Sequence, residues 1–266
     1  TTEIYTLSLH DALPIFMWPG LIPRGVFTII DGEPGTGKST ITLDLAARQS
    51  AGNDLPDGEP CSPGRVIILS AEDRGDNTIV PRLMAAGGDR SPIRTVPYAM
   101  KVPDREARGL SLQKDIAQLA GLVDELDAKL LIIDPITAFL GKGVNPNDDY
   151  RVRSVLGPIR TLAETTGITV ILVRHLNKKE GLSAINRGSG SIGLIAASRS
   201  GLLVGPDPYD PDTKVLAAVK YNLTGKPLAW RYRIVSEPVK SDDGTELDTG
   251  KVEWMGDTDI TADQLV

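Results

Sequence analysis

The chain has 266 residues, 41% of them hydrophobic, and a formal net charge of −6. This length is sufficient for one large α/β domain with a buried core. No apolar run approaches the roughly 20 residues that a membrane-spanning helix needs, so we expect no membrane partner. The single cysteine, Cys61, excludes an intrachain disulfide and is typical of a reducing compartment, so we expect a cytoplasmic protein.

Charge is distributed unevenly along the chain. Residues 236–266 contain nine acidic residues and two lysines, and residues 1–15 contain two acidic residues. Because the whole chain carries −6, residues 16–235 carry about +3. This balance argues against a broad basic surface, but it does not exclude nucleic-acid binding, because local loops can make the contacts.

The first fifteen residues, TTEIYTLSLHDALPI, resemble the conceptual translation of a sequencing adapter. We therefore expect residues 1–15 to be a non-native segment and the natural start to be missing. His10 then has no functional meaning, and His175 is the one histidine left for chemistry.

The first predicted strand, residues 26–30, is followed by a glycine-rich loop and then by a helical pattern at 40–47. The loop, GEPGTGKS, fits the phosphate-loop pattern G-x-x-x-x-G-K-[ST] at every fixed position. The predicted nucleotide-binding residues are Gly32, Glu33, Pro34, Gly35, Thr36, Gly37, Lys38, Ser39 and Thr40. The alternative, a glycine-rich turn without a ligand, fits this strand–loop–helix context poorly.

Each part of this loop has a chemical task. Glycines let backbone N–H groups curl around phosphate oxygens, Lys38 reaches the β and γ phosphates, and the Ser39 hydroxyl is a Mg²⁺ ligand. The helix that follows adds the positive end of its dipole. The sequence therefore predicts a nucleoside triphosphate site, with ATP and Mg²⁺ as cofactors.

Further strands and helices alternate along the chain. We expect strands at 65–70, 129–134 and 168–173, and helices at 77–86, 112–126 and 152–165. These strands are continuously apolar, which is typical of a parallel sheet covered on both faces. Later runs at 200–204, 214–221 and 228–235 are short and separated by turns, so we expect added antiparallel strands or hairpins. The predicted fold class is α/β, with a central, mostly parallel twisted sheet and helices on both faces.

Three polar residues come at the ends of predicted strands, where ligands bind in parallel α/β sheets. Asp134 closes LLIID and is the candidate Mg²⁺ ligand; the alternative is a turn aspartate before Pro135. Glu72 is the candidate general base that activates water, with Asp73 as a close competitor and a solvated loop acid as the alternative. His175 is the candidate γ-phosphate sensor, although a lone histidine is more often structural.

The motifs occur in the order GEPGTGKS, SAED, LLIID, VRHLNKK, RGSGSIGLIAASRSGLLV and AAVKYN. This order resembles that of the RecA-like P-loop ATPases, and most of all the plasmid RepA-type hexameric helicases and related AAA ATPases of phages and mobile elements. The resemblance covers roughly residues 18–235. It implies an ATP hydrolase in which Glu72 is the catalytic base, Asp134 holds Mg²⁺ and His175 senses the γ-phosphate. We expect a RecA-like ATPase domain at 16–235 and an acidic, truncated C-terminal extension at 236–266.

The resemblance also implies a ring-shaped homo-oligomer, such as a hexamer, that contacts single-stranded DNA. In such rings the loops after the third and fourth strands face the central channel, which here means residues 141–151 and 177–191. The implied phosphate contacts are Lys142, Lys178, Lys179 and Arg187. Solvated mobile loops are the alternative, and Tyr150 is the one aromatic residue available for stacking on bases.

Such rings complete each ATP site with cations from the neighbouring subunit. The resemblance makes Lys220 a candidate for this trans-acting cation, together with Arg199 or Arg187, and a surface lysine is the alternative. The family often has a second basic residue where this chain has Asn222, so the identity of the cation stays open.

Three functions remain to be separated. The leading prediction is an oligomeric, Mg²⁺-dependent DNA helicase or DNA-remodelling ATPase. The second is an ATP-gated recombination or loading accessory protein that assembles on DNA without unwinding it. The third, a small-molecule P-loop kinase, is disfavoured because the sequence has no lid-like arginine cluster and no second substrate motif.

Overall fold

The structure is a computed structural model that describes residues 16–73, 75–97, 99–100, 108–141, 143–145, 148–176, 184, 192–223, 225, 227–241 and 243–266. The adapter-like segment 1–15 lies outside these residues. So do the four predicted DNA contacts, Lys142, Lys178, Lys179 and Arg187.

A nine-stranded sheet forms the centre of the described chain, in the order β13-β12-β11-β10-β3-β9-β8-β4-β5. The strands are β3 (Phe27–Gly32), β4 (Arg65–Ser70), β5 (Ile93–Pro97), β8 (Ala128–Asp134), β9 (Thr169–His175), β10 (Ser200–Pro206), β11 (Lys214–Tyr221), β12 (Ala229–Lys240) and β13 (Glu246–Thr258). Neighbouring strands from β10 to β5 are parallel, and β11, β12 and β13 are added antiparallel. The predicted fold class is confirmed.

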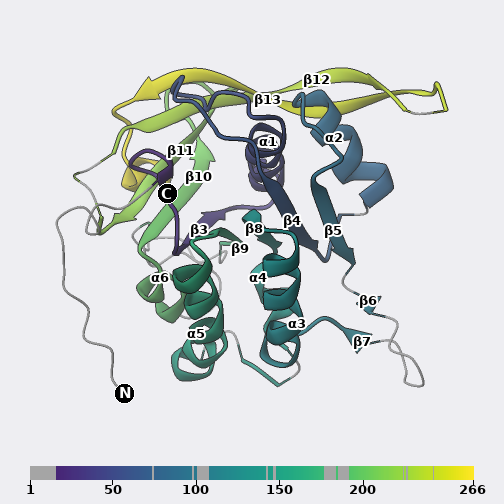
Figure 1. Cartoon of the computed structure of the whole chain (residues 1–266). Helices are drawn as coiled ribbons and strands as arrows, with labels where there is room; N and C mark the ends of the chain where they lie inside the picture. The colour runs from purple at the N-terminus through teal and green to yellow at the C-terminus, as the bar shows by residue number, and fades with distance from the viewer. Residues whose placement is uncertain are drawn as a thin grey trace.

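Helices cover both faces of this sheet (Figure 1). One face carries α1 (Lys38–Ala51), a π-helical turn (Gly75–Ile79) and α2 (Val80–Ala85); the other carries α3 (Leu112–Glu125), α4 (Ile136–Phe139), α5 (Asp149–Thr166) and α6 (Ile192–Ala197). Short two-stranded pairs join β1 (Phe16–Trp18) to β2 (Ile22–Pro23) and β6 (Ala99–Met100) to β7 (Arg108–Gly109), and a 3₁₀ turn (Ala262–Leu265) ends the chain. None of the helices in the described ranges is long and apolar enough to cross a bilayer.

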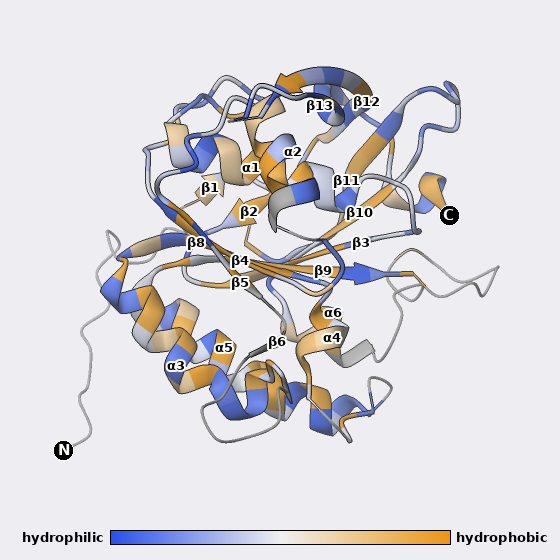
Figure 2. Ribbon diagram, turned by 90° about the vertical axis from the view of Figure 1, so that its right-hand side faces the viewer, coloured by the Kyte–Doolittle hydropathy of each residue, from blue (hydrophilic) through white to orange (hydrophobic). Residues whose placement is uncertain are grey.

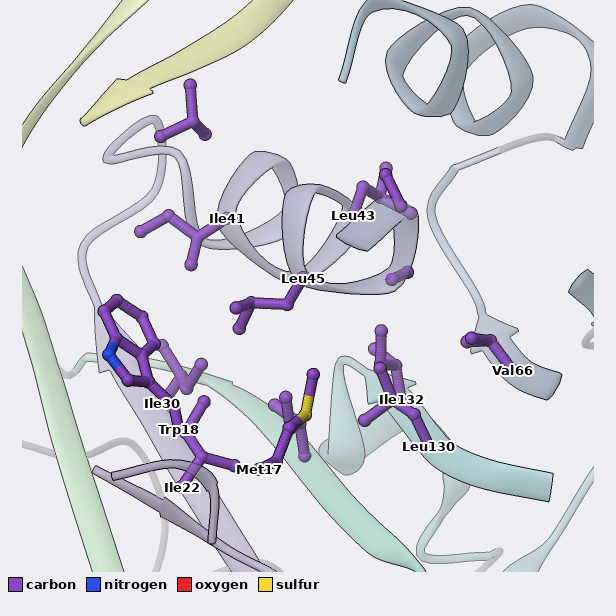
Figure 3. Close-up of a cluster of buried hydrophobic side chains, with 14 of the residues drawn as sticks. Met17, Trp18, Ile22, Ile30, Ile41, Leu43, Leu45, Val66, Leu130 and Ile132 are labelled. Carbon is purple, nitrogen blue, oxygen red and sulfur yellow. The ribbon is translucent and has the colours of Figure 1, made fainter. Parts of the chain in front are cut away.

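The core has one layer on each side of the sheet. Figure 2 shows that the central strands are mostly hydrophobic, whereas α3 and α5 mix hydrophobic and hydrophilic residues. On the α1 side, Ile41 and Leu45 of the helix face strand residues Ile30 and Ile132, with Trp18 beside them (Figure 3). Burial of such side chains contributes about 1.5–3 kcal/mol each, so these two layers fix the position of the strand ends that carry polar residues.

Two expectations need correction. The run at 200–204 was expected to be antiparallel, but β10 is parallel to β3, because the connection from β9 contains α6 and therefore returns to the same edge of the sheet. The boundary expected at residue 236 lies inside β12, which pairs with β13 over its whole length. Most of the acidic residues there are exposed on a two-stranded ribbon, and their polar composition gives no indication of these strands.

Candidate functional site

The phosphate loop joins the end of β3 to the start of α1. Gly35 and Gly37 have φ angles of 79° and 91°, in the left-handed region that favours glycine. The Thr36 hydroxyl donates to the Glu33 carbonyl at 2.8 Å, which closes the turn internally. A cradle of backbone N–H groups at the start of a helix is the arrangement that binds phosphate, so the residues fit a nucleotide.

Lys38 lies across the mouth of this loop. Its side chain is buried, and its Nζ donates to the carbonyls of Gly32 and Glu33 at 2.8 and 2.7 Å. Burial lowers the pKa of Lys38, and the nearby carboxylates, Asp134 first among them, act in the opposite direction. The ammonium group therefore occupies the loop at the place where phosphate charge has to be neutralised.

Ser39 and Asp134 meet at the end of β8. The Asp134 side chain is largely buried and accepts a hydrogen bond from Ser39. Burial raises the pKa of Asp134, while Ser39 and Lys38 lower it. A hydroxyl and a carboxylate are the oxygen donors that Mg²⁺ prefers, and a bound cation would favour the ionised carboxylate, so this pair fits the predicted metal.

Glu72 and His175 approach each other from strands on opposite sides of β8. Glu72 follows β4, His175 ends β9, and their Oε1 and Nε2 atoms lie 3.6 Å apart. The Glu72 side chain is 64% exposed, so its carboxylate is open to a ligand or water. Within the described part of the chain, the buried His175 Nδ1 has no hydrogen-bond partner.

Asp73, the competitor of Glu72, is engaged elsewhere. Its carboxylate accepts from Arg82 of α2 at 3.1 Å, and its backbone N–H donates to the Ser70 hydroxyl at 3.0 Å. Its charge still raises the pKa of Asp134. Asp73 therefore lies beside the candidate metal ligand, but its carboxylate is directed towards an arginine.

A buried ion pair that we did not predict lies directly behind this site. Arg174 donates to both carboxylate oxygens of Asp31 at 2.7 and 2.6 Å, and both side chains are almost fully buried. The two residues are register partners across β3 and β9. The pair therefore ties the strand that enters the phosphate loop to the strand that ends in His175. Two opposite charges inside otherwise apolar strands were the signal that could have indicated it.

Lys220 and Arg199 lie at the other end of the sheet. They line a pocket of about 300 Å³ near Phe27, at the amino end of β3, together with Arg153 and Arg160 of α5. Because β3 has six residues, about 20 Å of strand separate this pocket from the phosphate loop. The structure thus brings Lys38, Ser39, Glu72, Asp134 and His175 together at one edge, and it places Lys220 and Arg199 away from them.

The Lys220 ammonium group is held within its own chain. Its Nζ donates to the carbonyls of Ile195, Ala196 and Ser198, at 2.9, 2.8 and 2.7 Å. These carbonyls come from the C-terminal end of α6, where a cation is favourable. Burial lowers the pKa of Lys220, and the charges of Arg199 and Arg153 act in the same direction.

Comparisons with known proteins identify relatives of this chain. Over 162 residues, the chain is 25% identical to the DNA repair protein RadA of Halalkalibacterium halodurans and 24% identical to that of Bacillus subtilis. Each match covers 60% of this chain and 30% of the relative, so the chain matches less than a third of either protein.

The fold has a counterpart among solved structures. A KaiC-like protein from the hyperthermophilic archaeon Pyrococcus horikoshii superposes with a TM-score of 0.58 at 15% identity, over 84% of this chain and 95% of that one. At this identity the likeness shows the fold, which is that of the RecA-like P-loop proteins. A family model described as an AAA domain matches residues 16–181, which is more than half of the chain and includes the phosphate loop, Glu72, Asp134 and His175. The chain therefore belongs to the AAA domain family of RecA-like P-loop ATPases.

Proposed function

We propose that this protein binds ATP with Mg²⁺ and hydrolyses it, and that it works as an oligomer on DNA. The observation that carries the proposal is the convergence of Lys38, the Ser39–Asp134 pair and the Glu72–His175 pair at one edge of the sheet. When bound, Mg²⁺ would neutralise charge on the phosphates. Lys38 and the loop N–H groups would hold the phosphates, while Ser39 and Asp134 would hold the ion.

Glu72 is the residue that we assign to water activation. Its carboxylate is exposed, and it faces His175, whereas the carboxylate of Asp73 is bound to Arg82. A general base must reach the attacking water directly, so the uncommitted carboxylate suits the role better. His175, beside it, would contact the γ-phosphate and respond to its loss.

Lys220, with Arg199, is proposed as the cation that completes a neighbouring subunit's site. Their pocket contains two further arginines, Arg153 and Arg160, and it lies at the edge opposite to the phosphate loop. Head-to-tail assembly brings opposite edges of identical subunits together, as this role requires. In a free subunit, the carbonyls of α6 hold the Lys220 ammonium group.

Mixing two inactive variants tests this role. Lys220→Ala and Glu72→Gln subunits should each turn over ATP slowly, but an equimolar mixture should regain activity, because roughly a quarter of the shared sites then combine an intact Glu72 with an intact Lys220. Steady-state ATPase assays on the separate and mixed proteins measure this. No recovery on mixing would make Lys220 a structural residue that holds α6.

The proposed DNA contacts are Lys142, Lys178, Lys179 and Arg187. Support comes from the RadA relatives, which are DNA repair proteins, although this chain matches 30% of each. Replacing Lys178 and Lys179 together by alanine should lower the slope of log affinity against log salt by about 1.4, since each phosphate contact on single strands contributes about 0.7. Fluorescence anisotropy with a labelled oligonucleotide measures this slope. The matched control replaces Lys114 and Lys129, and an equal change in that variant would contradict the assignment.

One experiment tests the function as a whole. ATP turnover is measured with and without single-stranded DNA, and the mass of the particle is measured with and without a non-hydrolysable ATP analogue. We expect DNA to stimulate turnover and the analogue to promote assembly into a ring. Strand displacement from a forked duplex then distinguishes a helicase from an accessory ATPase. ATP turnover that is the same with and without DNA would instead favour a small-molecule kinase.

A further inference from the structure

The hairpin of β12 and β13 forms the outer wall of the phosphate loop. It lies over α1 and α2 at the far side of the sheet from α3 and α5 (Figure 1). Its residues, Ala229–Lys240 and Glu246–Thr258, follow the segment 16–181 that defines the family. Its contacts with the loop are therefore a property of this chain beyond the matched domain.

Tyr232 of this hairpin bonds directly to the loop. Its hydroxyl donates to the Thr36 carbonyl at 2.7 Å, and its side chain is fully buried. Burial raises the pKa of Tyr232, so the hydroxyl stays protonated and remains a donor at physiological pH. The bond joins residues that are 196 positions apart in the sequence.

Aromatic packing holds Tyr232 in place. Its ring lies 5.5 Å from that of Trp254 on β13, and Trp254 lies 5.2 Å from Trp18. The Trp254 Nε1 donates to Asp44 of α1 at 2.9 Å. Since rings of this kind are rigid, and the side chains of Tyr232 and Trp18 are fully buried, the Tyr232 hydroxyl is presented to the loop from a fixed position.

The hairpin also crowds Gly37, where an added side chain would require Ile234 to shift. A Cβ built on Gly37 would come within 2.4 Å of Ile234 Cδ1, and the φ of 91° disfavours other residues as well. Tyr232 and Ile234 therefore contact both residues of the Thr36–Gly37 peptide. The conformation of that peptide depends on the hairpin as well as on the loop itself.

We propose that Tyr232 is a positioning residue for nucleotide binding, which turns the Gly37 N–H towards the phosphate by anchoring the Thr36 carbonyl on the opposite side. The Thr36 carbonyl and the Gly37 N–H belong to one planar trans peptide and point in opposite directions. An anchor on the carbonyl therefore also fixes the direction of the N–H. A backbone N–H that is already aligned needs no reorganisation when phosphate binds. This inference rests on the proposed ATP site and adds to it a residue outside the family domain.

Tyr232→Phe tests the inference, because it removes one hydroxyl and keeps the ring. The KM for ATP and the Kd for ADP should rise about 3- to 10-fold, as expected for one lost hydrogen bond, while kcat stays within about twofold of wild type. Backbone amide exchange of residues 33–38 in the nucleotide-free protein should become faster. Steady-state kinetics, calorimetry and hydrogen exchange supply the three readouts.

Two controls separate positioning from general stability. Arg231→Ala removes the ion pair between this hairpin and the buried Asp207, which does not involve the phosphate loop, and it should lower the melting temperature but leave the KM unchanged. Tyr209→Phe removes an exposed hydroxyl and should change neither the melting temperature nor the KM for ATP. Wild-type affinity and exchange in Tyr232→Phe, or an equal rise in KM for Arg231→Ala, would overturn the inference. Failure of the wild-type protein to bind ATP would instead overturn the proposed function.

Discussion

Lys38→Ala is expected to weaken ATP binding by at least about 100-fold. The loss of two charge-assisted hydrogen bonds to phosphate, at about 1.5–3 kcal/mol each, accounts for this size. The Lys38 Nζ donates hydrogen bonds to the Gly32 and Glu33 carbonyls, at the place where the phosphates would bind. Isothermal titration with ATP and Mg²⁺ measures the change.

The same substitution also removes a buried side chain from the loop, so stability must be followed separately. The matched control is Lys129→Ala, which removes an exposed lysine paired with Asp127. This control should leave nucleotide affinity unchanged. Tight ATP binding by a folded Lys38→Ala protein would contradict the nucleotide site itself, and with it the whole proposed function.

Local sequence patterns predicted the elements that build this site. Continuously apolar runs predicted β4, β8 and β9 to within two residues at each end. Strands that are buried on both faces are apolar at nearly every position, so the run itself marks the strand. The phosphate loop was readable because its glycines and lysine are adjacent in sequence. The expected positions of Glu72, Asp134 and His175 followed from the rule that parallel strands end at a common edge.

Pairing between distant segments could not be predicted in the same way. The approach of Glu72 to His175 depends on β4 and β9 lying on either side of β8, and strand order leaves no local signal. Likewise, the hydrogen bond from the Tyr232 hydroxyl to the Thr36 carbonyl depends on how the β12–β13 hairpin packs against the phosphate loop. The boundary expected at 236 came from composition, and composition does not distinguish a polar tail from an exposed β-ribbon.

Lys220 is the candidate residue for which the sequence resemblance and the structure point to different partners. Its motif suggests a cation for a neighbouring site, while its ammonium group donates to three carbonyls at the C-terminal end of α6. Both contacts can be made in turn, since assembly would bring the nucleotide phosphates of the neighbouring subunit to the Lys220 ammonium group. A phosphate outcompetes a carbonyl for an ammonium group, because the phosphate carries a full opposite charge and the carbonyl offers only a dipole.

Glu72→Gln should lower ATP turnover by roughly 100-fold or more while leaving nucleotide affinity intact. The Gln amide has the same shape as the Glu side chain but cannot accept the proton from the attacking water. Loss of a general base typically lowers the rate about 10²–10⁴-fold. Affinity should persist because the exposed Glu72 side chain is not among the groups proposed to hold phosphate or Mg²⁺. Single-turnover hydrolysis and equilibrium titration separate the two effects.

Asp73→Asn is the matched control, because it makes the same chemical change one residue away. The Asp73 carboxylate is bound to Arg82, so its replacement should lower the melting temperature slightly and leave turnover within a few-fold of wild type. The opposite pattern, with turnover lost in Asp73→Asn and kept in Glu72→Gln, would move the catalytic base to Asp73. Because both acids follow β4 and precede the same helix, only the direction of the carboxylate decides between them, and the contact of Glu72 with His175 favours Glu72.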